Sequence, residues 1–349
     1  MTASEDKSQH FLTSARARTL DLKRIARMSE EEAVDAFVLL RYAETNGEPY
    51  CPKCGCQVTY KVNRKIKHRK TGEVTGTSRK YTCAECTHQF SPTSGTIFHG
   101  RKLEHRDILF GIALWVNGAK GEAALHLCRD MNVNPKTAFI LEKKLREVMG
   151  TLQHAAKLSG EVEGDATYVG GYVKPANLKK NRRDRRKLAN QSGKRQAITV
   201  LRERGGKSRA FVQTEKQTAA VMRDLVEDGT FLIFDESKAF DGLEALFDVK
   251  RVNHDGNDTK NYGEAAYSRD GVHTNLAESS HSRLKRSQMG VHHRISGDHL
   301  QGYADEMTWR EDHRRKSNGE QFLTLVTAGL HHPPSMQWKG YWQRRKEAA

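Results

Sequence analysis

The 349-residue sequence predicts an α/β protein whose α/β domain is preceded by a cysteine-rich module and a helical region. Three observations indicate this organisation. Two Cys-x-x-Cys pairs lie within residues 51–86, helical patterns follow within residues 103–150, and strand-like and helix-like segments alternate from about residue 160. Such alternation is typical of an α/β domain, and the chain length favours two or three domains.

The composition is strongly basic. Lysine and arginine number 59 against 43 acidic residues, a formal net charge of +16, which indicates a polyanionic partner, with nucleic acid as the first expectation. No apolar run reaches transmembrane length, and residues 1–20 lack the basic-then-apolar order of a secretory signal. Six cysteines are too few for a disulfide scaffold. We therefore expect a soluble, cytoplasmic protein.

The first predicted element is a short helix within residues 28–48. Ser29 and Glu32 have the spacing of a capping box, Ala33, Phe37 and Leu40 supply apolar positions, and Gly47 is the predicted stop.

Two cysteine pairs follow this helix. Cys51 and Cys54 form the first pair, and Cys83 and Cys86 form the second. Two short loops that each present two sulfurs can close a tetrahedral thiolate site, which favours structural Zn²⁺. The alternative, a redox dithiol beside a chance pair, requires a thioredoxin-like βαβ setting that the sequence does not show.

The stretch between the cysteine pairs supports a zinc ribbon. Val58, Tyr60 and Val62 alternate as in a strand, a turn is predicted at residues 71–76, and a second strand enters at residues 80–82. Cys56 is interpreted as a spare cysteine, and Cys128 as a small buried hydrophobic residue.

Three helices are predicted within residues 103–150. The last has Asn134 as its cap, Pro135 at its first position, an apolar face through Ala138 and Leu145, and Gly150 as its end. It also carries four basic residues, Lys136, Lys143, Lys144 and Arg146. A short turn before a basic helix suggests a helix-turn-helix-like DNA-binding region, and the alternative is a helical linker with a solvated charged face.

The α/β domain is predicted from the order of its segments. Strands are expected at 160–173, 195–206, 208–215, 230–236 and 248–255, and helices at 216–229, 238–247 and 274–290. The resulting domain boundaries are 1–48 (helical segment), 49–100 (zinc ribbon), 101–152 (helix-turn-helix-like region), 158–316 (catalytic α/β domain) and 317–349 (basic extension).

A dense basic loop lies between the first two strands of that domain. Its members are Lys179, Lys180, Arg182, Arg183, Arg185, Arg186 and Lys187. Such a run suits DNA phosphates, whereas the alternative is a solvated loop.

Three acidic residues stand at positions suited to metal chemistry. Asp165 lies in the first strand, Asp235 closes another strand, and Glu278 lies early in a helix. Carboxylates brought together from these places can hold two Mg²⁺ ions and support in-line phosphoryl transfer. Taken singly, each acid is as well explained as a surface residue or a helix cap.

Several of these stretches together resemble a known family. The ribbon "CPKCG…YTCAEC…FSPTSGTIF", followed by "DATYVGG", "FDESKAFDGL" and residues 273–315, resembles bacterial insertion-sequence transposases of the DDE superfamily that have an ISXO-type catalytic domain. The resemblance covers nearly the whole chain. It implies a ribonuclease H-like fold, cleavage at element ends with Mg²⁺ or Mn²⁺, transfer of the 3′ ends into target DNA, and a homo-oligomer on DNA associated with the nucleoid.

The resemblance carries over to Asp165, Asp235 and Glu278. Aligning on Tyr168 to Gly171 selects Asp165 rather than the nearby Glu163 as the first acid. Glu278 is preferred over Asn275 as the third ligand because a hard cation prefers an anionic oxygen.

Two neighbours of Glu278 receive supporting roles. Lys285, two helical turns beyond Glu278, is expected to contact a substrate phosphate, and Asn275 is expected to act as a supporting hydrogen-bond donor. His292 and His293 are expected to pack or to contact phosphate rather than to bind a metal. Competing functions are a catalytically inactive, domesticated DNA-binding regulator and a metal-dependent DNA nuclease.

Overall fold

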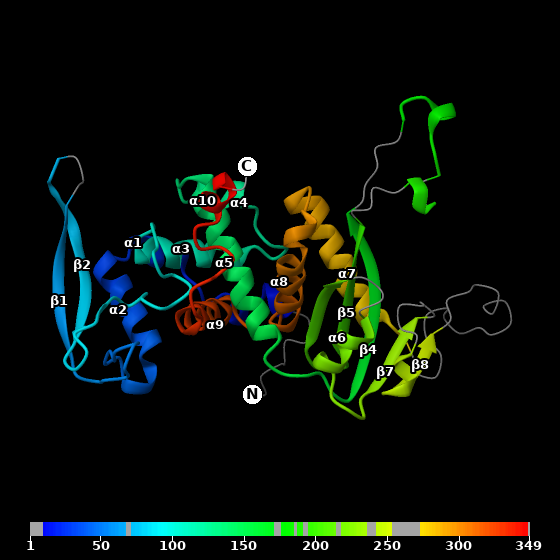
Figure 1. Cartoon of the computed structure of the whole chain (residues 1–349), viewed down its shortest axis with the longest axis horizontal. Coiled ribbons are helices and arrows are strands. Elements are labelled where there is room, and N and C mark those ends of the chain that lie inside the picture. The colour runs from blue at the N-terminus through cyan, green and yellow to red at the C-terminus, as the bar shows by residue number, and fades with distance from the viewer. Residues whose placement is uncertain are drawn as a thin grey trace, which may run out of the picture. The chain divides into compact units, whose positions relative to one another are not determined.

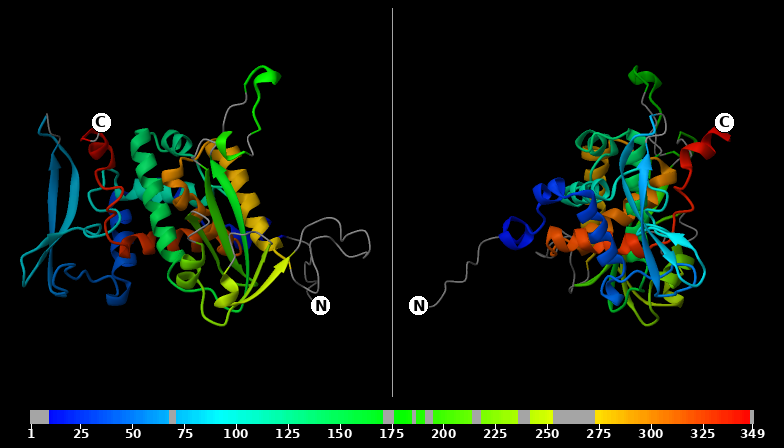
Figure 2. Two further views of the ribbon diagram at one scale, coloured as in Figure 1. Left: turned by 45° about the vertical axis from the view of Figure 1, so that its right-hand side comes forward. Right: turned by 90° about the vertical axis from the view of Figure 1, so that its left-hand side faces the viewer.

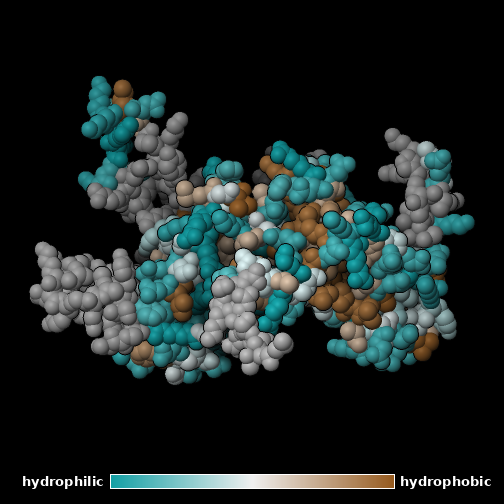
Figure 3. All heavy atoms as spheres, turned by 180° about the vertical axis from the view of Figure 1, so that it is seen from behind, coloured by the Kyte–Doolittle hydropathy of each residue, from teal (hydrophilic) through white to brown (hydrophobic). Residues whose placement is uncertain are grey.

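The computed structural model describes residues 10–67, 71–170, 176–184, 187–190, 195–213, 218–235, 242–252 and 273–347 (Figure 1). The chain divides into two compact units. The first comprises residues 1–118, 124–148 and 315–349, and the second comprises residues 119–123 and 149–314. Hydrophilic residues predominate on the face shown in Figure 3, in keeping with a mean hydropathy of −0.76. Of the helices in the described ranges, none combines the length and apolarity needed to cross a membrane.

The first unit contains a small antiparallel sheet and a set of helices. Its strands are β1 (Thr59–Lys67), β2 (Val74–Cys83) and β3 (Gln89–Phe90), in the order β1-β2-β3. Its helices are α1 (Leu22–Arg27), α2 (Glu30–Arg41), α3 (His105–Asn117), α4 (Ala124–Asp130), α5 (Pro135–Gln153, whose last turn lies in the second unit), α9 (Asn318–His331) and α10 (Tyr341–Glu347).

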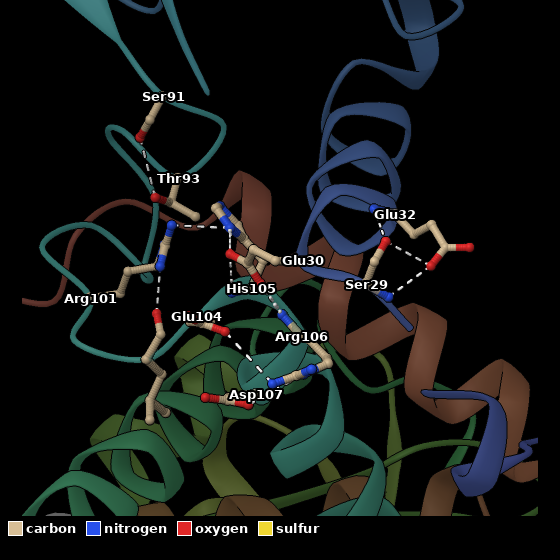
Figure 4. Close-up of polar contacts among 11 residues, drawn as sticks. Ser29, Glu30, Glu32, Ser91, Thr93, Arg101, Glu104, His105, Arg106 and Asp107 are labelled. Atoms are coloured by element: carbon tan, nitrogen blue, oxygen red, sulfur yellow. Dashed lines mark hydrogen bonds and ion pairs between the residues drawn. The ribbon is translucent and has the colours of Figure 1, made fainter. Parts of the chain in front are cut away.

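The predicted capping box is confirmed at α2. The Ser29 Oγ accepts from the Glu32 backbone N–H at 3.2 Å, and the Glu32 carboxylate accepts from the Ser29 backbone N–H at 2.7 Å (Figure 4). The helix ends at Arg41 rather than near Gly47, because the chain turns through a 3₁₀ segment, Ala43–Thr45, before it reaches Gly47.

The three helices predicted after the ribbon are present as α3, α4 and α5. Asn134 caps α5 as predicted, since its Oδ1 accepts from the Lys136 backbone N–H at 2.9 Å. The prediction that Gly150 ends α5 is wrong, because the helix continues to Gln153. Gly150 instead allows a close approach, as an added Cβ would lie 2.9 Å from Asp305 Oδ2.

The C-terminal residues form α9, which packs against α2 and α3 of the same unit. Asn318, at the start of α9, accepts from the backbone N–H groups of Thr19 and Leu20, both at 2.9 Å. Residues 317–349, predicted only as a basic extension, therefore help to build the first unit.

The second unit is built on a five-stranded mixed sheet. Its strands are β4 (Glu161–Gly170), β5 (Arg195–Glu203), β6 (Ser208–Gln213), β7 (Phe231–Asp235) and β8 (Asp248–Val252). Its helices are α6 (Thr218–Leu225), α7 (Asn275–Ser287) and α8 (Leu300–Asp312). The strand order is β6-β5-β4-β7-β8, antiparallel from β6 to β4 and parallel from β4 to β8. This order confirms the predicted α/β class, with the mixed sheet of a ribonuclease H-like fold.

Most predicted elements of this unit are present. The strand pair expected at 195–215 is the antiparallel pair β5–β6. The helix expected at 238–247 is not found in its described part, where Leu243–Ala245 form a single 3₁₀ turn, and residues 238–241 lie outside the described residues.

Apolar side chains cover both faces of the sheet. Val162, Phe234 and Met222 belong to the core on the α6 side, and Val200 and Leu284 belong to the core on the side of α7 and α8 (Figures 1 and 2). Gly164 lies on the α6 side, where an added Cβ would overlap the Phe234 ring. Its neighbour Asp165 consequently faces α7, because successive strand residues point to opposite faces.

Candidate functional site

The four predicted zinc ligands converge. All four Sγ atoms lie within 4.8 Å of one another, and the separations are 3.6 Å for Cys51–Cys86 and 3.5 Å for Cys54–Cys83 and for Cys54–Cys86. Four sulfurs held about 2.3 Å from a tetrahedral zinc ion lie about 3.8 Å apart. The cluster therefore fits Zn²⁺ closely.

The backbone of each cysteine loop supports this arrangement. Gly55 and Thr87, each the residue after the second cysteine of a pair, adopt left-handed φ angles of 77° and 55°. In the second loop the Cys86 N–H donates to Cys83 Sγ at 3.5 Å. Glycine adopts this conformation without steric cost, whereas Thr87 does so against its preference.

The pKa values of two of the four thiols are shifted in opposite directions. The backbone N–H of Cys86 lowers the pKa of Cys83 to about 6. A backbone hydrogen bond at Cys56 lowers the pKa of Cys54, but the neighbouring sulfurs and burial raise it more, to about 12. Four thiolates at this distance repel one another, so a divalent cation is required to hold all of them deprotonated.

The two remaining cysteines lie outside the cluster. Cys56 Sγ faces the Val58 carbonyl oxygen at 3.6 Å, and Cys128 is buried in α4, as the sequence predicts.

The two predicted catalytic aspartates occupy equivalent positions on neighbouring parallel strands. β4 and β7 pair with Glu163 opposite Ile233. Asp165 and Asp235 each lie two residues further along, and Asp235 ends β7. For Asp235 the description covers the backbone only. The register therefore places Asp165 and Asp235 side by side on the adjacent strands β4 and β7.

Helix α7, which carries Glu278, lies along this part of β4. His281 Nε2 is 2.9 Å from the Asp165 carbonyl oxygen and 3.6 Å from its Oδ2. A carbonyl can only accept, so Nε2 carries the proton and donates it. Burial lowers the pKa of His281 to about 4, which keeps the imidazole neutral at physiological pH.

The start of α7 is held by a carboxylate from the same strand. Glu163 Oε2 accepts the backbone N–H of Leu276 at 2.9 Å, and its Oε1 accepts from Arg204 Nε at 3.0 Å. His273 Nδ1 lies 3.1 Å from the same Oε1. Glu163 is fully buried, and its negative charge suits the positive end of a helix dipole. It therefore acts as a cap supplied by another element.

Glu163 and Asp165 of β4 contact the same helix at two different points. Both residues face α7 because they are two apart on β4. The helix rises about 7.5 Å from Leu276 to His281, and the strand rises about 6.6 Å from Glu163 to Asp165. The Glu163–Leu276 and Asp165–His281 contacts therefore have similar spacings along β4 and α7, and the backbone of Glu278 lies between them on the helix. Sequence reasoning missed the capping role of Glu163, although the Glu-x-Asp spacing was its signal.

The other predicted residues of α7 lie on its accessible side. Glu278 is partly buried, and its Oε1 accepts from Thr274 Oγ1 at 3.3 Å. Lys285 is exposed, and its charge contributes to lowering the pKa of His281. Asn275 is exposed at the first position of the helix. His292 packs edge-on against Tyr303, with ring centroids 4.7 Å apart, as expected of a packing histidine.

The described part of the basic loop is fully accessible. Lys179, Lys180, Arg182, Arg183 and Lys187 are exposed, and Arg185 and Arg186 lie outside the described residues. Residues 179–181 form a 3₁₀ turn that stands away from the sheet in Figure 1.

Two basic residues predicted on the surface of α5 are buried instead. Lys143 Nζ lies 5.2 Å from the centre of the Phe139 ring and is 3% exposed. Arg146 is 1% exposed, pairs with Glu142 at 3.0 Å and lies over Trp115. These two side chains stabilise the helical region rather than present charge to solvent, because aromatic rings attract their cationic heads. Lys136 remains exposed.

A second capping glutamate joins α2 to α3. Figure 4 shows Glu30 beside His105 and Arg106 at the start of α3. Its carboxylate accepts the backbone N–H groups of both residues, at 2.9 and 3.0 Å, and lies 2.6 Å from His105 Nδ1. Arg101 Nη2 lies 3.0 Å from the same ring nitrogen. This network fixes the start of α3 against α2.

Comparison with protein families identifies both parts of the chain. A model of the ISXO2-like transposase domain matches residues 157–312, and a model of the transposase zinc-ribbon domain matches residues 28–89. Comparison with curated proteins and with solved structures gave no significant match.

Proposed function

Because this chain belongs to the transposases with a zinc ribbon and an ISXO2-like DDE domain, we propose that it binds the ends of an insertion sequence, cleaves them and transfers the freed strands into target DNA. The observation that supports this best is the equivalent placement of Asp165 and Asp235 on β4 and β7, with α7 held alongside by Glu163 and His281.

We assign the acidic residues to divalent metal. Asp165, Asp235 and Glu278 would hold Mg²⁺ or Mn²⁺, hard cations that prefer carboxylate oxygens. The Asp165 side chain is 20% exposed, so it is open enough to take a ligand. The bound metal supplies charge stabilisation and an activated oxygen nucleophile for in-line phosphoryl transfer.

The chain's own groups position this site. Neutral His281 holds the Asp165 backbone and adds no positive charge next to the carboxylate. Lys285 is placed to contact a substrate phosphate, and Asn275 to donate a hydrogen bond near the first turn of α7. Zn²⁺ in the cysteine cluster holds the ribbon, which together with the helical region recognises the element ends. The basic loop contributes phosphate contacts without base readout. Assembly of several copies on DNA remains a prediction from the family.

The test uses labelled DNA with the inverted repeats that flank the gene, and a plasmid target. Glu278→Gln is expected to bind the ends normally but to join them on the order of 10³-fold more slowly in Mg²⁺ or Mn²⁺, because charge stabilisation at the reacting phosphate is lost. Asn275→Ala is expected to be impaired but active. The opposite pattern would show that the two roles are reversed.

The same assay separates the competing functions. Cutting without joining by the wild-type protein would indicate a nuclease. End binding without cutting or joining would indicate a DNA-binding regulator.

A further inference from the structure

A large groove lies within the first unit, whereas the three acidic residues belong to the second. It has a volume of 770 Å³, in the range of natural ligand sites. It is lined by residues 98–103 after the ribbon, Ile108 of α3, Asn134 with the first half of α5, and residues 338–343. Its walls combine charge with aromatic surface, and neither the metal centres nor the basic loop contributes to it.

The charge of this groove is one-sided. Among the described residues that line it, five are cationic and none is acidic. Arg101 is engaged with His105, whereas Lys102, Lys136 and Lys339 are exposed and Lys144 is half-buried. Such a surface is complementary to a polyanion.

The aromatic side of the groove comes from the C-terminal residues. Phe139 of α5 is in ring contact with Trp338, Tyr341 and Trp342, at centroid distances of 6.3, 6.1 and 5.7 Å. Lys136 Nζ lies 5.2 Å from the centre of the Trp342 ring. The Trp342 Nε1 is buried and has no hydrogen-bond partner among the described residues.

We propose that this groove binds single-stranded DNA, with bases stacked on Trp342 and Tyr341 and phosphates contacted by Lys136, Lys144 and Lys102. Stacking requires exposed base faces, which a duplex hides and a single strand offers. A duplex would be read by a protruding helix in its major groove, but Trp338 and Tyr341 pack against Phe139 on α5. The proposal rests on the proposed function only for the source of the strand, which is a cleaved element end.

The test measures the fluorescence anisotropy of dye-labelled oligodeoxythymidylate during titration with the full-length protein, without added Mg²⁺. The background substitutions Arg182→Gln and Arg183→Gln reduce binding by the basic loop. Binding is expected, and Trp342→Leu should weaken it by about 5- to 150-fold, the range of about one to three kcal/mol measured for base stacking. Trp342→Phe should retain most of the affinity.

Matched controls separate stacking and local charge from general effects. Phe11→Leu removes a half-buried aromatic side chain from the 3₁₀ turn Phe11–Thr13, and Lys23→Gln removes an exposed charge on α1. Both should bind like the parent protein. Lys136→Gln with Lys144→Gln should weaken binding and flatten its salt dependence, because fewer counterions are released.

Three results would overturn the proposal. The first is absence of binding. The second is equal binding of inorganic polyphosphate and oligodeoxythymidylate, together with no effect of Trp342→Leu. The third is a preference for a hairpin duplex over the single strand. The oligonucleotide probe lacks element-end sequence, and the assay involves no cleavage. A failure of strand joining would therefore not contradict a positive result in this binding test. Absence of oligonucleotide binding would likewise not contradict the proposed acidic site.

Discussion

The cysteine cluster and the acidic site are built in opposite ways. The cluster takes its four ligands from two short loops joined by one hairpin, in which Thr59 pairs with Cys83. The proposed acidic site would take Asp165, Asp235 and Glu278 from two strands and a helix, separated by long stretches of chain. A local site needs only its own loops, whereas a dispersed site needs other residues to hold its elements in register. Glu163 and His281 connect β4 to α7 and would have that task here.

The largest expected effect is on the local site. Cys83→Ser removes one of four thiolates, and full-length protein should lose its zinc, expected at about one ion per chain, because apparent binding free energies of about 10–16 kcal/mol depend on the complete ligand set. Cys56→Ser is the matched control and should keep its zinc. Metal analysis of both variants is the measurement. Full zinc in Cys83→Ser would show that Cys83 is not a required ligand of the local site.

The next effect concerns the dispersed site. Glu163→Gln leaves all three proposed metal ligands in place but weakens the cap of α7, so strand joining should fall by about 10–100-fold, as for other residues that orient ligands. Hydrogen exchange of the Leu276 amide should speed up as well. Glu161→Gln, at a half-exposed neighbour that also contacts Arg204, is the control and should change little. Joining at the wild-type rate in Glu163→Gln would show that the register does not depend on this cap.

Glu30 provides the corresponding test in the first unit. Burial raises its pKa, but hydrogen bonds from His105 and Arg106 lower it more, to about 2. Burial lowers the pKa of His105. Because both pKa values are lower in the folded state, both groups stabilise the fold fully above their unfolded-state pKa values. Acidification removes this stability: the part due to His105 is lost below about pH 6.5, and the part due to Glu30 is lost between about pH 4.5 and 2.

Glu30→Gln should therefore cost about 1–3 kcal/mol at neutral pH and flatten the acid dependence of unfolding. Denaturant unfolding at several pH values measures this, with Glu31→Gln, at an exposed neighbour in the same first turn, as the control. Zinc content should stay unchanged. An unaltered acid limb of the stability curve would argue against a capping role for Glu30.

The smallest effect is expected from the basic loop, which belongs to neither metal centre. Arg182→Gln with Arg183→Gln should weaken DNA binding of any sequence and reduce the slope of log K against log salt by up to about two. Binding titrations at several salt concentrations would show this. Loss of end preference with unchanged nonspecific binding would instead assign base readout to the loop.

Local patterns in the sequence determined much of this protein. The cysteine spacing, the capping box at Ser29 and the cap at Asn134 each depend on residues within a few positions of one another, and all three are present as predicted. Strand periodicity likewise predicted the strands of the mixed sheet. These features follow from backbone geometry that nearby residues impose, so no distant contact is needed to read them.

Only the tertiary structure decided which charged residues are structural. Lys143 and Arg146 resemble surface charges in the sequence but are buried against aromatic rings, and Glu163 resembles a spare acid but caps a helix more than a hundred residues away. The groove lined by Lys136 and Trp342 likewise joins segments about two hundred residues apart. The role of a charged side chain depends on its burial and its partners, and those partners are brought to it only when distant segments pack together.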